Sequence, residues 1–166
     1  MRNSPLFKLA LICVTLAGSA VHAKEVVGWV ETALVYPGAV AIKAKIDSGA
    51  KTSSLNCQCI TPKKRDGKEW VSFSVKNHRG EIVMIEKPVL RVAKIKRHFG
   101  EQQQRYVVKL GICLGSVYRE EEVTLVDRSG FNYQLLIGRN FLEKDFLIDT
   151  GDTYLNKPKC KNAPLE

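Results

Sequence analysis

The chain has 166 residues, and 45% of them are hydrophobic, which is enough to build the core of one globular domain and excludes a disordered tail. The formal net charge is +9 at pH 7. The basic residues form no single dense block beside stacking aromatics, so the composition argues against a nucleic-acid-binding protein. A solvated basic surface is the simplest interpretation, and attraction for acidic peptides or an anionic cell envelope is the alternative.

The first 23 residues have the pattern of a secretory signal peptide. Arg2 and Lys8 accompany an apolar stretch at residues 9–17, and small residues lead to Ala23, after which we expect cleavage. The alternative is a membrane anchor, but this apolar stretch is shorter than the ~20 residues that a span needs. We therefore expect an exported, periplasmic protein without a transmembrane anchor, with one domain over residues 24–160 and a tail over residues 161–166.

Four cysteines follow the expected cleavage position: Cys57, Cys59, Cys113 and Cys160. An exported chain meets an oxidising compartment, which favours disulfides. A bond between Cys57 and Cys59 would be strained because only one residue separates them, so we expect one of the two to pair with Cys113 or Cys160. Zinc is the rival interpretation, but Cys-x-Cys is not the usual ligand spacing and no histidine pair stands nearby. We therefore predict no metal site.

The rest of the chain consists of short apolar or alternating segments separated by turns that contain Gly, Pro or Asp, a pattern that predicts an all-β barrel or sandwich. The clearest alternation covers residues 69–75, and Asp66-Gly67 before it is typical of a hairpin turn. We expect Trp29 to pack on the core and the tail from Asn156 to be loose. The other expected strands are residues 26–30, 32–36, 40–46, 52–56, 82–85, 88–92, 104–113, 117–126 (where the glutamates 120–122 break the alternating pattern at a turn or edge), 133–137, 146–149 and 154–155.

An alternating apolar segment at residues 40–46 leads directly into Asp47, Ser48 and Gly49. This pattern predicts a strand that ends in a tight loop, with the carboxylate at the tip of the loop. Glycine allows the backbone there to approach a neighbour or a ligand closely. Aspartic proteases present their catalytic carboxylate on such a loop, although Asp-Ser-Gly is also ordinary turn chemistry.

A second motif, Gly138-Arg139-Asn140, follows an apolar segment at residues 135–137 and precedes a helical turn expected at residues 141–145, which Asn140 could cap. Together the two motifs resemble the retropepsin-type aspartic proteases, and the chain is similar to the bacterial branch of that fold labelled as an ATP-dependent zinc protease. The matching positions are Asp47, Ser48, Gly49, Ala50, Ser53 and Leu55 in the first motif, and Ile137, Gly138, Arg139, Asn140 and Leu142 in the second. The resemblance implies an all-β, retropepsin-like closed barrel or sandwich with one short helix after Gly138-Arg139-Asn140.

The resemblance also implies a reaction. In an aspartic protease two carboxylates share one proton, so that one of them activates water while the other polarises the scissile carbonyl. A chain of this size supplies one such group, so the resemblance implies a homodimer in which the Asp47 carboxylates of the two subunits meet. A β-hairpin flap would cover the site, and the turns at residues 65–67 and 77–80 are both candidates.

The resemblance gives the neighbouring residues supporting roles. In the active-site loop, Ser48 would form hydrogen bonds across the two-fold axis, Gly49 would let the loops touch, and Ala50 would line the substrate pocket. Arg139 and Asn140 would support the loop from below.

Three further residues bear on this interpretation. Asp149 begins a second Asp-Thr-Gly and is the candidate second acid for a pair with Asp47 inside one chain. It follows the Gly-Arg-Asn motif, where the resemblance places a dimer-forming strand, and this favours ordinary turn chemistry. Lys45 and Lys51 flank the Asp47 loop and, if they lie close to it, would stabilise its negative charge and oppose proton sharing.

The sequence contains no Gly-rich phosphate loop for ATP and no His-Glu-x-x-His zinc motif, so we predict no ATP and no cofactor. We expect an exported aspartic endopeptidase that acts on peptides or proteins. A non-catalytic peptide- or envelope-binding module on the same fold is one alternative, and a metal-dependent peptidase is another. A cysteine nucleophile, built from Cys57 or Cys113 with His78 or His98, is a third, which oxidation of the thiols would abolish.

Overall fold

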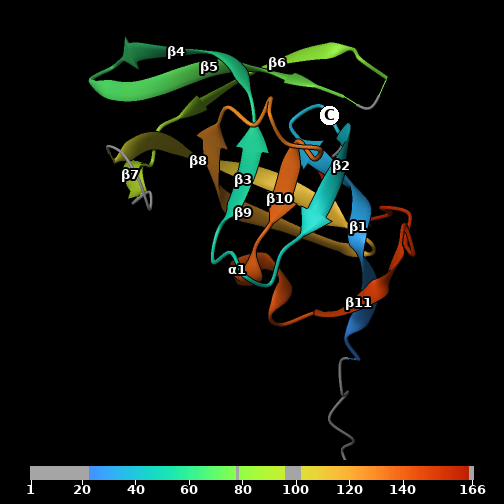
Figure 1. The fold of residues 1–166 in the computed structure, drawn as a ribbon. Helices are drawn as coiled ribbons and strands as arrows, with labels where there is room; N and C mark the ends of the chain where they lie inside the picture. The colour runs from blue at the N-terminus through green and yellow to red at the C-terminus, as the bar shows by residue number, and fades with distance from the viewer. Residues whose placement is uncertain (1–22, 78, 96–101, 165–166) are drawn as a thin grey trace, which may run out of the picture.

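The structure is a computed structural model that describes residues 23–77, 79–95 and 102–164 (Figure 1). The predicted signal peptide, apart from Ala23, therefore lies outside the described residues. Across these ranges no helix is long and apolar enough to cross a membrane.

The regular secondary structure of the described chain is β-strand apart from one short helix, which confirms the predicted all-β class. The strands are β1 (Glu25–Tyr36), β2 (Val40–Ile46), β3 (Ser53–Asn56), β4 (Gln58–Arg65), β5 (Lys68–Lys76), β6 (Ile82–Pro88), β7 (Arg91–Ile95), β8 (Gln103–Leu114), β9 (Val117–Val126), β10 (Leu135–Ile137) and β11 (Phe146–Thr153), and the short helix is α1 (Arg139–Leu142).

Six strands close into a barrel in the order β1-β2-β10-β3-β9-β8 and back to β1, as the resemblance implied. Closure depends on β1, which pairs with β2 through residues 30–35 and with β8 through residues 33–36. The pairs β2–β10 and β3–β9 are parallel, and the other four are antiparallel. The barrel therefore brings β2 and β10, which precede the two sequence motifs, side by side.

Alternation along the strands decides which side chains fill the barrel. In β2, Val40, Ile42, Ala44 and Ile46 are buried, whereas the residues between them are partly or fully exposed. Burial of apolar area stabilises this arrangement by roughly 25 cal/mol per Å². The strand that fills the core thus ends at a fixed, buried position immediately before Asp47.

The strands β4, β5 and β6 form a separate antiparallel sheet that lies across one end of the barrel (Figure 1). The predicted hairpin is present, with Asp66 and Gly67 in the left-handed region at φ values of 50° and 72°. Val71, Phe73 and Val75 of β5 are buried and belong to the same core as the barrel. This sheet therefore closes one end of the core.

Two expectations about local structure are wrong. β9 runs without interruption through its three glutamates, because its register with β8 continues across them. Asn140 does not cap α1, because Gly138 is the N-cap residue and no side chain bonds to the helix start. The position of α1 is therefore set by contacts of its backbone.

The last strand, β11, pairs in parallel with β1 at the edge of the sheet, outside the barrel. The chain then crosses β1, where the Tyr154 N–H donates to Val30 O at 2.8 Å and Asn156 Nδ2 donates to Val26 O at 2.5 Å. Residues 154–155 are therefore not a strand, and the tail that begins at Asn156 is not loose, contrary to expectation.

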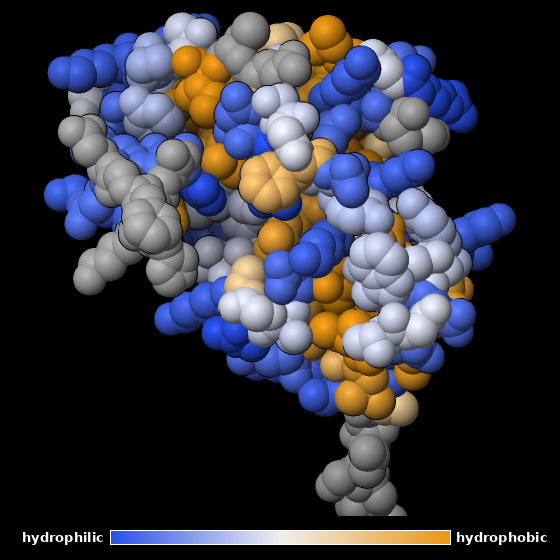
Figure 2. All heavy atoms as spheres, in the orientation of Figure 1, coloured by the Kyte–Doolittle hydropathy of each residue, from blue (hydrophilic) through white to orange (hydrophobic). Residues whose placement is uncertain are grey.

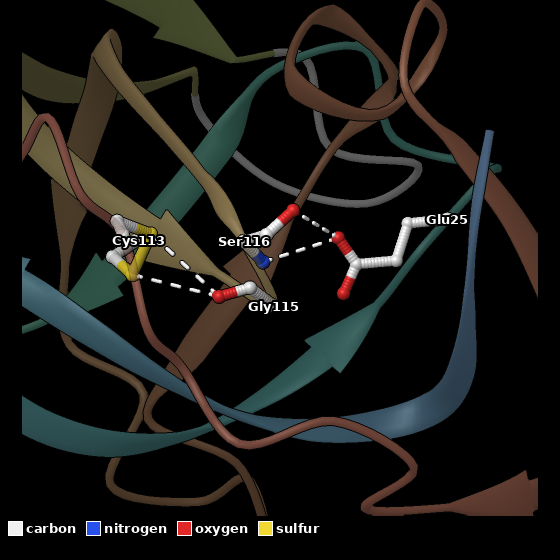
Figure 3. Close-up of a disulfide and its surroundings, with 5 residues drawn as sticks. Glu25, Cys113, Gly115 and Ser116 are labelled. Carbon is white, nitrogen blue, oxygen red and sulfur yellow. Dashed lines mark hydrogen bonds between the residues drawn. A yellow bond between two sulfur atoms is a disulfide. The ribbon is translucent and has the colours of Figure 1, made fainter. Parts of the chain in front are cut away.

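A disulfide between Cys113 of β8 and Cys160 fixes the tail to the turn between β8 and β9 (Figure 3). Close by, the Lys159 N–H donates to Gly115 O at 2.7 Å. In the same turn the hydroxyl of Ser116 donates to the Glu25 carboxylate at 2.8 Å. The end of the tail is thus joined covalently and by hydrogen bonds to the barrel.

The expectation that Cys57 or Cys59 would pair with Cys113 or Cys160 is wrong. Cys57 follows β3 into the core and is a buried free thiol. Burial raises the pKa of this thiol to about 12. The side chain of Cys59 lies outside the part that the structure describes.

Candidate active site

The loop that carries Asp47 is held by the backbone of the neighbouring strand. The Asp47 N–H donates to Ile137 O at 2.9 Å, which continues the parallel pairing of β2 with β10. Within the loop, the Asp47 carboxylate accepts a bond from the Gly49 N–H at 2.9 Å, and the Ala50 N–H donates to Asp47 O at 3.3 Å. The carboxylate thus sits on a tight turn at the end of a rigid strand.

Arg139 and Asn140, the first two residues of α1, bind the same loop. Their backbone N–H groups donate to Ala50 O at 2.9 Å and to Lys51 O at 3.0 Å. The Arg139 guanidinium also donates to Ser48 O at 2.6 Å. The start of α1 therefore clamps the loop on both sides of Gly49.

Gly138 allows this close approach. A Cβ atom at this position would lie 2.7 Å from the carbonyl carbon and 2.8 Å from the carbonyl oxygen of Thr52, both of which belong to the backbone. The Gly138 N–H also donates to Ser53 Oγ at 3.2 Å. The two motifs therefore meet in space, and any side chain at Gly138 would push them apart.

Asp47 lines a cavity of about 400 Å³, and its side chain is 24% exposed. Trp29 and Tyr133 form part of the wall, with their ring centroids 5.9 Å apart in an edge-to-face arrangement. The complete lining is Trp29, Lys45, Asp47, Arg128, Phe131, Asn132, Tyr133 and Leu136. Apolar and aromatic walls around a few charged groups are typical of ligand sites.

The position of Trp29 corrects the sequence analysis, which expected it in the core. Trp29 is 37% exposed, because β1 departs from regular register between Gly28 and Val30 and presents the ring to the Asp47 cavity. The aromatic residue that seemed to be a core residue is therefore part of the candidate site.

Two cations lie in the cavity with Asp47. Lys45 Nζ is 3.6 Å from Asp47 Oδ2, so the expected proximity is present for Lys45. Lys51 is exposed and does not line the cavity. The second cation is Arg128, a buried residue that the sequence analysis did not single out.

No pattern in the sequence marks Arg128, because its position depends on how the loop between β9 and β10 folds back. Its guanidinium donates to Ser54 Oγ at 3.1 Å and to Tyr133 O at 3.2 Å. Burial and the neighbouring Arg105 lower the pKa of Arg128, and the Asp47 carboxylate acts in the opposite direction. Arg128 and Asp47 thus interact within one cavity.

The candidate second acid, Asp149, does not line this cavity. It lies on β11 opposite Gly28, is exposed, and accepts a bond from the Gly151 N–H at 2.8 Å. Among the described lining residues Asp47 is the one carboxylate. The described part of one chain therefore supplies one carboxylate to the site.

The structure describes only part of the alternative nucleophile and metal sites. Cys113 is oxidised in the disulfide, and His78 and His98 lie outside the described residues. Within the described ranges no three residues of the His, Cys, Asp and Glu types form a group that could hold a metal ion.

The turn between β5 and β6, one of the two flap candidates, lies beside the site. Asn77 and Arg79 of this turn line a second cavity of about 440 Å³. Asn132 lines both this cavity and the cavity that holds Asp47. The turn at residues 65–67 lines neither of them.

A family model for RimB-like proteins, described as "Retropepsin-like aspartic endopeptidase RimB", matches residues 26–159. The chain belongs to this family. A solved structure of a Legionella pneumophila protein of unknown function (Lpg0085, DUF785) shares this fold, with a TM-score of 0.68 and 31% identity. The match covers 80% of this chain and 98% of the Legionella chain, so RimB-like architecture accounts for nearly all of that protein.

Curated relatives of this RimB-like chain carry a different name. A "Probable alpha-L-glutamate ligase" of Shewanella pealeana is 39% identical over 120 residues, which cover 70% of this chain and 26% of the relative. One with the same name from Parasynechococcus marenigrum is 35% identical over 137 residues, which cover 77% of this chain and 29% of the relative. The chain thus spans little more than a quarter of the curated relatives that it matches.

Proposed function

We propose that the protein is an aspartic endopeptidase whose active unit is a homodimer, with one Asp47 from each subunit. The observation that carries the proposal is the clamped Asp47 loop, which presents a partly exposed carboxylate to a cavity large enough for peptide side chains. The family description agrees with this chemistry.

The proposed reaction needs a second carboxylate beside Asp47. Two such groups at close range cannot both ionise easily, so they hold one proton between them. The ionised one takes a proton from water, the water attacks the scissile carbonyl, and the protonated one donates a hydrogen bond to the carbonyl oxygen. Because one described chain supplies a single carboxylate to the cavity, the second would come from the partner subunit.

Other residues of the loop have supporting roles in this proposal. Ser48 and Gly49 lie next to Asp47 and would meet their counterparts across the two-fold axis. Arg139 would keep the loop rigid through its bond to Ser48 O, and this rigidity would hold the two carboxylates at a fixed separation. Exposed apolar residues lie on β1 and β11, and orange atoms are interspersed with pale and blue ones at the lower end of the molecule in Figure 2. These residues are candidates for the dimer contact.

The test is the Asp47→Asn variant. We expect it to fold, since Asn preserves the size of the side chain and an acceptor for the Gly49 N–H, and to lose cleavage of unfolded proteins and peptides by about a thousandfold or more. Asp149→Asn is the matched control and should cleave normally. Full activity of the Asp47→Asn protein would reject the proposal.

A mixing experiment tests the dimer separately. An excess of Asp47→Asn subunits mixed with wild-type subunits should suppress activity, because mixed dimers hold one carboxylate. Activity that falls only in proportion to the wild-type concentration would show that one subunit suffices.

The ion pair between Lys45 and Asp47 favours a second candidate, a non-catalytic peptide-binding module. Lys45 Nζ lies 3.6 Å from Asp47 Oδ2 and so pairs with the carboxylate that the reaction requires. This candidate predicts that the wild-type protein binds peptides without cleaving them, and that Asp47→Asn leaves binding intact. Incubation of wild-type protein with an unfolded substrate over a range of pH values separates the two candidates.

The substrate and the compartment complete the proposal. Because the curated relatives are named for glutamate ligation, we include peptides that carry added glutamate among the candidate substrates. Export to the periplasm is supported by the signal-like residues before Ala23 and by the disulfide, which an oxidising compartment favours. Cell fractionation tests this location, and protein found only in the cytosol would reject it.

A further inference from the structure

The tail of the chain alternates between contact with the barrel and exposure to solvent. Lys157, Lys159 and Lys161 are exposed, whereas Pro158 and Cys160 between them are partly buried. Alternate residues of an extended segment point to opposite sides. The alternation therefore places the three lysines together on the side of the tail that faces away from the barrel.

The backbone that carries these lysines is held in place. The disulfide joins Cys160 to Cys113, and the Lys159 N–H donates to Gly115 O at 2.7 Å, beside the disulfide in Figure 3. All three lysines line one cavity of about 310 Å³ at this position. A row of cations on a fixed backbone loses little conformational entropy when it binds a partner.

The described part of the protein does not neutralise this row of cations. None of the three ammonium groups forms an ion pair with a described carboxylate. Glu25 also lines the cavity, but its carboxylate accepts hydrogen bonds from the N–H and the hydroxyl of Ser116 at 3.1 and 2.8 Å. Residues 154–164 contain no acidic residue. An extended anionic surface would therefore attract all three lysines at once.

Exposed apolar side chains lie at the start of the same segment. Tyr154 is 48% exposed and Leu155 is 44% exposed, although the Leu155 N–H is held by the buried Glu31 carboxylate at 3.0 Å. Both residues lie outside β1 and β11, which carry the candidates for the dimer contact. We call Tyr154, Leu155, Lys157, Lys159 and Lys161 the basic surface.

This combination favours a lipid partner over a soluble polyanion. Lysines are attracted to the phosphates of anionic lipids, and aromatic and aliphatic side chains enter the interfacial region of a bilayer. A soluble polyanion would bind the lysines but would leave Tyr154 and Leu155 in water.

We infer that the basic surface docks on the surface of an anionic phospholipid bilayer. The three lysines contact the lipid phosphates, while Tyr154 and Leu155 enter the headgroup region. The inference does not depend on the proposed cleavage, because the basic surface contains no residue of the Asp47 cavity. Asp47→Asn should therefore bind vesicles as tightly as the wild type does.

The test is co-sedimentation of the full chain with lipid vesicles. One set contains phosphatidylcholine alone, and the other is an equal mixture of phosphatidylcholine and phosphatidylglycerol. We expect at least roughly tenfold tighter binding to the mixed vesicles, since each lysine near an anionic surface contributes about fivefold. Added salt should weaken this preference.

Variants assign the preference to the basic surface. Lys157→Gln/Lys159→Gln/Lys161→Gln should lower the affinity for mixed vesicles by roughly tenfold or more. The matched control is Lys64→Gln/Lys68→Gln/Lys94→Gln, which removes the same charge at exposed positions on β4, β5 and β7 and should stay within about twofold of wild type. All variants carry the same first 23 residues, so differences among them report the folded domain.

A second variant distinguishes lipid from a soluble polyanion. Tyr154→Ser/Leu155→Ser keeps the charge and should weaken binding to mixed vesicles, but it should leave binding to inorganic polyphosphate unchanged. Circular dichroism of each variant reports whether it is folded. If the triple tail variant does not fold, Lys159→Gln takes its place, with an expected loss of about fivefold.

Equal binding to the two kinds of vesicle, or an equal loss in the tail variant and its control, would overturn the inference. Vesicle binding that is unchanged in Tyr154→Ser/Leu155→Ser, together with equally tight binding to polyphosphate, would assign the basic surface to a soluble polyanion and reject the bilayer. Loss of cleavage in Asp47→Asn with normal vesicle binding would support both proposals, whereas cleavage that survives would reject the proposed function alone.

Discussion

Glu31 lies fully inside the protein, and its carboxylate accepts three backbone hydrogen bonds. One comes from the Gly28 N–H at 2.7 Å, and the others come from Leu155 at 3.0 Å and Asn156 at 3.3 Å. Through these bonds, the Glu31 carboxylate joins the irregular part of β1 to the start of the tail. The irregular part is the segment that presents Trp29 to the candidate site.

We predict that Glu31→Gln destabilises the protein by about 3 kcal/mol, because the amide N–H₂ would face backbone N–H groups that need an acceptor. Urea unfolding followed by circular dichroism measures the change. Glu69→Gln, at an exposed position on β5, is the control and should stay within about 0.5 kcal/mol of wild type. Equal stability of the two variants would contradict the role given to Glu31.

Glu121 differs from Glu31 in its hydrogen bonding. It is also buried, but its Oε1 has no hydrogen-bond partner in the described chain. Burial raises the pKa of this carboxyl group, so the folded state holds the proton more tightly than the unfolded state does. Its contribution to stability is therefore full below the unfolded pKa of about 4.3 and falls as pH rises toward the folded pKa.

We predict that Glu121→Gln is more stable than wild type at pH 7 and that this advantage disappears at pH 4, where Glu121 is protonated. Unfolding midpoints at the two pH values measure the difference. Glu122→Gln, the exposed neighbour on the same strand, should show no such dependence beyond the loss of its ion pair with Arg91. A gain that is the same at both pH values would show that burial of the charge is not the cause.

At the scale of the element, the candidate site depends on contact between the Asp47 loop and the start of α1. This helix has four residues and too few internal bonds to be stable alone. The backbone bonds from Arg139 and Asn140 to the loop, and the packing of Phe141 and Leu142 into the core, fix its position. The loop and the helix therefore stabilise each other.

We predict that Gly138→Ala destabilises the protein by about 2 kcal/mol and lowers cleavage, because its Cβ would meet the Thr52 backbone at less than 3 Å. Gly130→Ala is the matched control, since a Cβ at Gly130 meets nothing within 4 Å. Thermal unfolding and a peptide-cleavage assay measure the two effects. Normal stability and activity of the Gly138→Ala protein would show that the close approach is dispensable.

Many of the strands and turns were predictable from local sequence patterns. Alternation gave the strand before Asp47, and the Asp66-Gly67 pair gave the hairpin, because both signals lie within a few neighbouring residues. The burial of Glu121 and the exposure of Trp29 were missed, since each depends on strand register or on a bulge in β1. Arg128 and the contacts of Glu31 depend on segments far apart in sequence, and a single sequence does not indicate such contacts.

For the whole molecule, the disulfide between Cys113 and Cys160 joins two segments separated by 47 residues. In the chain-entropy model, a loop of that length restricts the unfolded state and stabilises the fold by about 4 kcal/mol. The sequence offered three pairings of four cysteines, and the tertiary path of the tail decided among them. Leu155 and Asn156, at the point where the tail begins, provide two of the three N–H groups that bind Glu31, so attachment of the tail affects β1 as well.

We predict that the Cys113→Ser/Cys160→Ser double variant loses stability by about 4 kcal/mol and becomes open to proteolysis in the tail, at lysines 159 and 161. Urea unfolding and limited trypsin digestion measure these effects. Cys57→Ser removes a buried thiol from the core but leaves the tail attached, so its tail should resist trypsin. Equal tail protection in both variants would show that hydrogen bonds alone hold this segment.

The parallel pairing of β1 with β11 has a consequence for biogenesis. Glu25 lies beside Phe146, so β1 is made early and receives its outer neighbour only after almost all of the described chain has been synthesised. Contacts between such distant segments form slowly, and until then an apolar strand is open to other nascent chains. A ribosome that stalls before β11 would therefore release a product whose first strand has an unpaired outer edge, which makes it a natural client for chaperones and quality-control proteases.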